Sequence, residues 1–143
     1  MILIDTNLLV YAHAGNVAQH EKAKQWLDEM LLSGVRIGLP WHSLLGFVRI
    51  VSNPRGFSRP ESVAGAWRQV QRWLEEDNTW IPLPTERHGA ILDEMFAAVR
   101  ITSRFVMDAH LAALAIEHGL TLCSNDQDFA RVPQLRWINP LDG

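Results

Sequence analysis

Three aspartates lie at junctions between predicted elements, where side chains from different parts of a chain can converge. Asp5 and Asp126 each follow closely after a short apolar run, and Asp108 lies in the first turns of an alanine-rich segment. Carboxylates that are brought together repel one another, and hard cations such as Mg²⁺ bind carboxylate oxygens. If the fold gathers these three side chains, they would form a site for a divalent cation.

Each aspartate also has a purely local interpretation. Aspartate is a favoured N-cap residue, so Asp5 could cap a helix, and Asp126 could cap the turn that carries Asp128. Asp108 near a helix start could simply interact favourably with the helix dipole. The residue types leave both interpretations open, and only the coincidence of all three aspartates favours the metal site.

Covalent catalysis has less support than a metal-activated water. No Ser-His-Asp set is evident, the single cysteine Cys123 lies inside a predicted strand, and the six histidines lack zinc-ligand spacing. His110 lies two residues after Asp108, so we expect it to point elsewhere. An aspartate nucleophile at Asp5 would resemble D-x-D phosphoryl transfer, but Asn7 occupies the second position of that pattern. A carboxylate-held cation that acidifies water fits the residues best.

Short apolar segments alternate with helical segments along the chain, and this alternation sets where the aspartates lie. Strands are predicted at residues 1–4, 35–39, 80–83, 120–123 and 135–138, and helices at 8–14, 17–32, 40–52, 58–76, 85–100 and 106–118. The pattern predicts an α/β fold with a mainly parallel central sheet flanked by helices, as a single domain over residues 1–143. Ligands of such sheets bind at the carboxyl ends of the strands.

Composition narrows the class of protein. The chain has 143 residues, of which 48% are apolar and 20% charged, as in an ordinary globular domain. A net charge of −3 excludes a protein that coats nucleic acid through an overall basic field. No signal peptide and no apolar run of bilayer length is present, and one cysteine fits a reducing compartment. We therefore expect a cytoplasmic protein that does not bind membranes.

Three segments in order, IDTNLLVYA, MDAHLAALAIEHG and LCSNDQDFARVPQLRWINPL, resemble the PIN domain of VapC-type toxin ribonucleases. The resemblance covers nearly the full chain and includes the middle segment GLPWHSLLGFVRIVSNPR. It implies a Mg²⁺- or Mn²⁺-dependent endoribonuclease that cleaves RNA, is neutralised by a small cognate antitoxin and usually forms a homodimer. It also implies that Asp5, Asp108 and Asp126 are the catalytic metal ligands, with possible support from Ser124 and Asp128.

One position departs from the family pattern. PIN domains usually carry a glutamate in the helix after the second strand, and Gly46 stands at that position in a helix without acidic residues. The site would then lack one negative charge. His42 lies four residues earlier on the same helix face and could reach toward the site. Arg49, close in sequence, is the residue we expect to contact RNA phosphates.

Two functions therefore follow from the sequence. The first is a metal-dependent endoribonuclease acting as the toxin of a toxin–antitoxin pair. The alternative is an RNA- or antitoxin-binding PIN-like module that cleaves weakly or not at all, because Gly46 replaces the usual glutamate. Exposed apolar residues would serve a dimer or antitoxin interface, and the residues expected there are Leu8, Leu9, Tyr11, Trp67 and Trp73.

Overall fold

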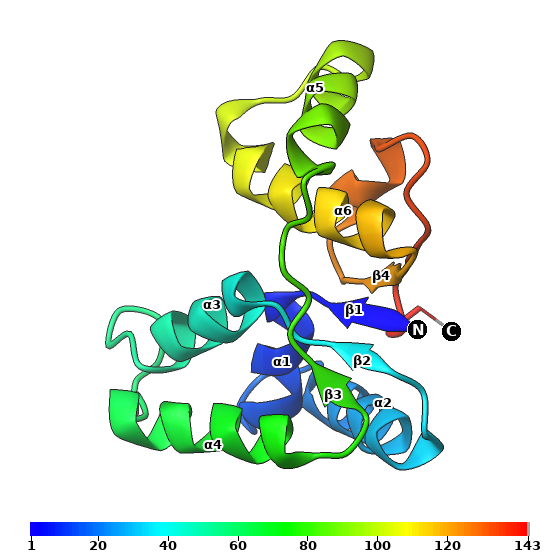
Figure 1. The fold of residues 1–143 in the computed structure, drawn as a ribbon. Helices are drawn as coiled ribbons and strands as arrows, with labels where there is room; N and C mark the ends of the chain where they lie inside the picture. The colour runs from blue at the N-terminus through cyan, green and yellow to red at the C-terminus, as the bar shows by residue number, and fades with distance from the viewer. Residues whose placement is uncertain (143) are drawn as a thin grey trace.

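A computed structural model describes residues 1–142 of the chain as one parallel sheet with helices packed around it (Figure 1). The strands are β1 (Ile2–Ile4), β2 (Ile37–Gly38), β3 (Thr79–Trp80), β4 (Thr121–Cys123) and β5 (Trp137–Ile138). The α-helices are α1 (Thr6–His13), α2 (His20–Ser33), α3 (Trp41–Val51), α4 (Val63–Glu75), α5 (His88–Ala98) and α6 (Val106–His118). Two short 3₁₀ helices, η1 (Ser103–Phe105) and η2 (Gln127–Arg131), complete the described elements.

The sheet has the strand order β3-β2-β1-β4-β5, and every pair is parallel. The predicted α/β fold is thus confirmed. The chain builds outward from β1 in one direction through β3 and then returns to add β4 and β5 on the other side. The strand order therefore reverses between β1 and β4, and the carboxyl ends of these two strands form the switch point at which open sheets bind ligands.

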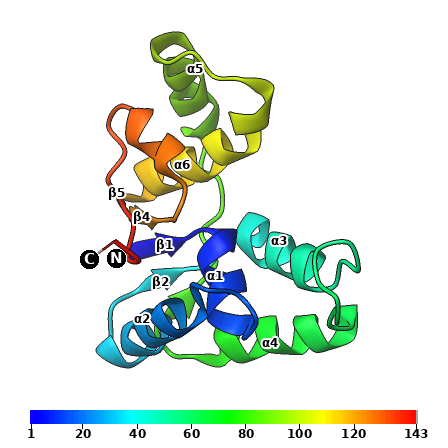
Figure 2. The same cartoon turned by 180° about the vertical axis from the view of Figure 1, so that it is seen from behind.

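The two faces of the sheet carry separate cores (Figures 1 and 2). Helices α1 to α4 cover one face, where Ile4 packs with Leu44 and Phe47. Helices α5 and α6 cover the other face, where Leu3 packs with Leu114. Neighbouring residues of β1 point to opposite faces, so this single strand supports both cores.

Local signals explain most of the helix boundaries. Helix α6 matches the predicted segment and ends at Gly119, whose positive φ of 65° suits a glycine. Helix α1 begins earlier than predicted, at Thr6, because Asp5 caps it. Helix α4 begins later than predicted, because Ser62 rather than Ser58 is its N-cap and accepts the Gly65 N–H at 3.0 Å.

The predicted apolar interface is partly wrong. Leu8 and Leu9 are 1% exposed and Trp73 is 7% exposed, so all three belong to the core between α1, α3 and α4. Trp67 remains 38% exposed and stacks on Trp41 with ring centres 6.2 Å apart. None of the described helices combines the length and apolar character needed to cross a lipid bilayer.

Candidate active site

Asp5 lies at the carboxyl end of β1 and divides its two carboxylate oxygens between local and long-range partners. One oxygen accepts the Thr6 N–H at 2.7 Å and caps α1, so the capping interpretation is correct. The other oxygen accepts the Ser124 hydroxyl at 2.7 Å, from the segment after β4. Burial raises the pKa of Asp5, whereas the hydrogen bonds from Ser124 and Thr6 lower it.

Ser124 and Asn7 join the ends of the two central strands. The buried Ser124 hydroxyl accepts the Asp126 N–H at 3.0 Å and the Asn7 side-chain amide at 3.2 Å. The side-chain oxygen of Asn7, Oδ1, in turn accepts the Asn125 backbone N–H at 3.3 Å. The sequence marked Asn7 only as a departure from a D-x-D pattern and did not predict this structural role. Its position two residues after Asp5 was the signal that could have identified it.

Asp108 lies in the first turn of α6, but it does not cap that helix, because Phe105 is the N-cap residue. Burial first, and then the negative charges of Asp5, Asp126 and Asp128, raise the pKa of Asp108 to about 6. The fold therefore brings all four predicted carboxylates into one region. Asp126 also caps η2, because it accepts the Asp128 N–H at 2.9 Å.

A small cavity of about 90 Å³ lies beside these carboxylates, and its lining consists of Thr102, Arg104, Phe105, Asp108, Asp126 and Asp128. This space corresponds to a few water molecules. Arg104 is the cationic side chain of the lining, whereas Arg49, the residue favoured from the sequence, lines a different cavity next to His42.

The donor chemistry fits a hydrated cation better than an all-protein cage. Among residues 1–142, no group of three or more His, Cys, Asp or Glu side chains forms a ready-made metal cage. The carboxylates are nevertheless close enough for their charges to raise the pKa of Asp108. Mg²⁺ keeps several waters and is usually held by one or two carboxylates, so carboxylates spaced in this way are suited to it.

Gly46 has a packing role that the sequence did not reveal. A Cβ atom at this position would lie 2.6 Å from the Thr6 Oγ1 and 3.1 Å from its Cγ2. The Thr6 hydroxyl also donates a hydrogen bond to the Ser43 carbonyl at 3.3 Å, across the contact between α1 and α3. A side chain at position 46 would therefore force the Thr6 side chain to shift, so the close approach of α1 and α3 favours glycine here.

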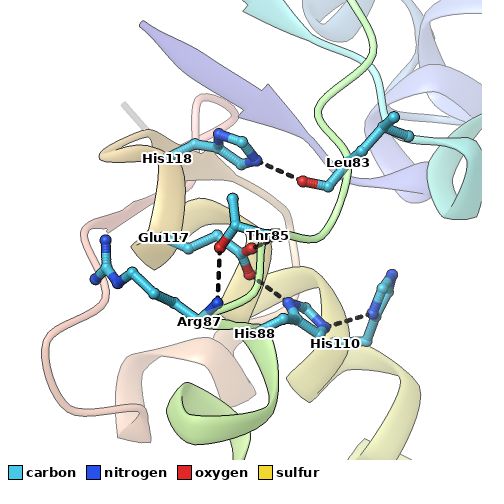
Figure 3. A network of polar contacts seen from close by, with 7 residues as sticks. All are labelled: Leu83, Thr85, Arg87, His88, His110, Glu117 and His118. Atoms are coloured by element: carbon cyan, nitrogen blue, oxygen red, sulfur yellow. Dashed lines mark hydrogen bonds and ion pairs between the residues drawn. The ribbon is translucent and has the colours of Figure 1, made fainter.

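A network of polar contacts joins α6 to the start of α5 and the segment before it (Figure 3). The buried Glu117 side chain accepts the Thr85 N–H at 2.5 Å and contacts the His88 Nδ1. The His88 Nε2 lies 3.0 Å from the His110 Nδ1, and the His110 ring packs edge-on against His42, with ring centres 5.9 Å apart.

This network gives two of the histidines a role that the lack of zinc-ligand spacing did not predict. His110 points away from Asp108 as expected, but toward α5 and α3 rather than into solvent. The ionised Glu117 accepts a hydrogen bond from His88 Nδ1, and one further hydrogen bond joins the His88 Nε2 to the His110 Nδ1. The seven-residue spacing of His110 and Glu117, which places both on one face of α6, was the available sequence signal.

His42, whose ring packs against His110, interacts electrostatically with Asp5 of the acidic cluster. Burial lowers the pKa of His42, whereas the charge of Asp5 raises it and the charge of Arg49 lowers it. The charge of His42 in turn lowers the pKa of Asp5. The structure therefore places His42 within electrostatic range of Asp5, on the side of α3 where the family's glutamate is absent.

The fold and the site together define an α/β protein with a single parallel sheet and an acidic cluster at its switch point. The chain belongs to the PIN domain family, whose model matches residues 2–135. The resemblance to VapC-type proteins is confirmed by relatives that span the whole chain.

The "VapC ribonuclease Mb2897" of Mycobacterium bovis is 37% identical over 143 residues, covering 100% of this chain and 97% of the relative. "Ribonuclease VapC37" of Mycobacterium tuberculosis is 39% identical over 140 residues, covering 98% of this chain and 97% of the relative.

Among solved structures, VapBC2 from Rickettsia felis bound to a promoter DNA fragment aligns with a TM-score of 0.67 at 19% identity, covering 97% of this chain and 98% of that chain. FitAcB from Neisseria gonorrhoeae also aligns with a TM-score of 0.67, at 19% identity and full coverage of both chains. The two structural alignments show that this chain shares the fold of those proteins.

Proposed function

We propose that this chain is a Mg²⁺- or Mn²⁺-dependent endoribonuclease that acts as the toxin of a toxin–antitoxin pair. The main support for the proposal is that Asp5, Asp108 and Asp126 converge at the switch point. The charges of Asp5 and Asp126 are close enough to raise the pKa of Asp108. The names of the full-length relatives as VapC ribonucleases support RNA as the substrate. The proposed place of action is the cytoplasm, where the enzyme would meet cellular RNA.

In this proposal the three aspartates hold the cation, and each is fixed by a different part of the fold. Ser124 and Asn7 orient Asp5 through hydrogen bonds to its Oδ2, the oxygen that does not cap α1. Asp128 adds negative charge beside Asp108. When bound, the cation supplies Lewis acidity and a lowered pKa of its water. Arg104 in the acidic cavity and Arg49 near His42 are the cations available to RNA phosphates.

The proposed partners are a small cognate antitoxin and a second copy of the chain. Structural neighbours from Rickettsia felis and Klebsiella pneumoniae are toxin–antitoxin complexes. We propose that a basic antitoxin side chain occupies the acidic cluster and competes with the cation. Antitoxin affinity should then fall as Mg²⁺ rises, and should weaken in the Asp126→Ala variant. Affinity that is indifferent to both changes would contradict this mode of neutralisation.

The decisive experiment is cleavage of total RNA by the purified chain, with Mg²⁺ and with excess EDTA. We expect fragments with Mg²⁺ and none with EDTA or with the Asp108→Asn variant. Asp93→Asn is the matched control, because Asp93 is exposed on α5, away from the cluster. Cleavage that survives EDTA unchanged would disprove the metal mechanism.

The second candidate is a PIN-like module that binds RNA or antitoxin without efficient cleavage. One observation favours it, namely that α3 carries no acidic residue and that a side chain at position 46 would press against Thr6. The same assay separates the two candidates. RNA binding in the absence of any Mg²⁺-dependent fragments would favour the binding module.

A further inference from the structure

A second cavity, of about 380 Å³, lies between the start of α3 and the start of α6. Its lining from α3 consists of His42, Leu45, Gly46 and Arg49, and Met107 of α6 completes the lining. The four α3 positions follow the i, i+3, i+4, i+7 spacing of one helix face. The lining therefore comes from both halves of the molecule. Figure 1 shows these halves, one built on α1 to α4 and the other on α5 and α6.

From the lining of this cavity and its position beside the acidic cluster, we infer that it is a nucleobase subsite, which binds the base of a nucleotide next to the phosphodiester bond that is cleaved. The inference rests on the proposed ribonuclease function and names how that site would contact its substrate. The cavity is of the size that small ligands occupy in proteins.

The chemistry of the lining matches a base with its phosphate. Leu45 and Met107 are 55% and 58% exposed, so the lining offers two large apolar side chains that a base can contact. The imidazole of His42 and the guanidinium of Arg49 are planar groups that stack on bases. Arg49 is the charged side chain of the lining, and no carboxylate lines the cavity to hold a basic peptide side chain. Charge complementarity therefore favours a nucleotide over a basic peptide segment.

The cavity lies next to the proposed cleavage site. Met107 directly precedes Asp108, and His42 lies within electrostatic range of Asp5. An RNA strand whose phosphate lies at the acidic cluster would therefore pass along this side of α3.

The first test measures binding without cleavage. The four ribonucleoside 5′-monophosphates are titrated into the wild-type chain in EDTA and followed by amide NMR shifts, with inorganic phosphate and ribose 5-phosphate as probes that lack a base. We expect at least one nucleotide to shift the amides of His42, Gly46 and Met107 and the two baseless probes to leave Gly46 and Met107 unshifted. Equal shifts from all the probes would overturn the base subsite, leaving only a phosphate contact at Arg49.

The second test measures selectivity of cleavage. Cut ends in total RNA are mapped, and a short synthetic RNA with the mapped cut is compared with versions that carry one abasic nucleotide beside it. Loss of the stacked base should slow wild-type cleavage by about tenfold. The Leu45→Glu variant should cleave both RNAs at nearly the same reduced rate, whereas Leu32→Glu, at an 88% exposed position on α2, should keep the wild-type difference.

The outcomes separate this inference from the proposed function. If the wild type cleaves RNA but Leu45→Glu keeps the full abasic penalty, the subsite is wrong and the ribonuclease proposal stands. If the wild type does not cleave RNA, the ribonuclease proposal fails and the nucleotide titration alone decides the subsite. If Leu45→Glu instead changes only the oligomeric state or antitoxin affinity, this face is a protein interface and the inference is overturned.

Discussion

Individual residues in the acidic cluster differ in how much of their role is structural. Asp5 caps α1 with one oxygen and accepts from Ser124 with the other, so removing it would disturb the helix and the site together. Asp108 has no capping role in α6 and owes its raised pKa to burial and to neighbouring carboxylates. Asp108 is therefore the cleaner probe of the charge cluster.

The first prediction concerns the Asp108→Asn variant in EDTA. Ionised Asp108 is destabilised in the folded chain, so the variant should have a free energy of unfolding at pH 7 that is about 1 kcal/mol higher than that of the wild type. A small loss of favourable helix-dipole interaction partly offsets this gain. Urea denaturation at several pH values measures the difference.

The pH dependence of this effect follows from the direction of the shift. Because the pKa of Asp108 is raised to about 6 in the folded state, its favourable contribution is fully present below the ordinary value of 3.8 and is lost as the pH rises through about 6. The advantage of Asp108→Asn should therefore vanish near pH 4. The Asp93→Asn control should show no such pH-dependent gain, and an Asp108→Asn variant that is less stable at pH 7 would contradict the electrostatic argument.

At the scale of elements, the contact between α1 and α3 depends on one glycine. Gly46→Ala would place its Cβ against the Thr6 side chain. Overpacking of this kind costs about 1–3 kcal/mol and outweighs the better helix propensity of alanine. We therefore expect a lower free energy of unfolding for Gly46→Ala, measured by urea denaturation.

A second substitution tests the cause of that loss. In a Thr6→Ala background the nearest remaining Thr6 atom is the Cβ, at the ordinary contact distance of 3.4 Å. Gly46→Ala should then be neutral or stabilising by about 1 kcal/mol. Gly89→Ala is the control, because a Cβ at Gly89 in α5 would meet nothing within 4 Å. Additive effects of the two substitutions would show that Thr6 is not the obstacle.

The third prediction concerns how α5 is attached to α6. The segment 81–87 carries the chain from one half of the molecule to the other, and α6 holds it where the His118 Nε2 lies 2.7 Å from the Leu83 carbonyl (Figures 1 and 3). Glu117→Ala would leave the Thr85 N–H and the His88 ring without their buried acceptor. We expect a loss of about 2–3 kcal/mol in the free energy of unfolding.

The readout of this prediction is local as well as global. Hydrogen exchange should quicken first at the beginning of α5, because that end of the helix is held by the carboxylate. The pKa of Glu117 is lowered by its contacts with His88 and Thr85 even though its burial raises it, so its stabilisation is present above the ordinary value of 4.5 and is lost as the pH falls below it. Glu94→Ala on the exposed face of α5 should change neither quantity.

At the scale of the whole molecule, the acidic cluster joins elements from both halves of the chain, so a bound cation should stabilise the entire fold. The fourth prediction is that Mg²⁺ raises the melting temperature, with a gain of about 2.7 kcal/mol at a hundredfold excess over its Kd. Calorimetry with and without Mg²⁺ measures this gain. Asp108→Asn should lose most of it, and Asp93→Asn should keep it. No stabilisation of the wild type by Mg²⁺ would contradict a cation site.

The sequence alone determined the features that depend on neighbouring residues. The alternation of apolar strands and amphipathic helices predicted the parallel α/β fold, and Gly119 predicted the end of α6, because hydrophobic periodicity and capping are local properties. The order of motifs also identified the family and placed three aspartates at element junctions. Helix starts were less accurate where two capping residues competed, as Ser58 and Ser62 did.

Only the tertiary structure decided which distant residues meet. The hydrogen bond between Ser124 and Asp5 joins positions 119 residues apart, and the network of Glu117, His88 and His110 joins α6 to α5. The reason that position 46 is glycine also lies in another helix, at Thr6. Such contacts depend on how helices pack across a sheet rather than on local propensity, and no periodicity along the chain records the distance between two side chains that packing brings together.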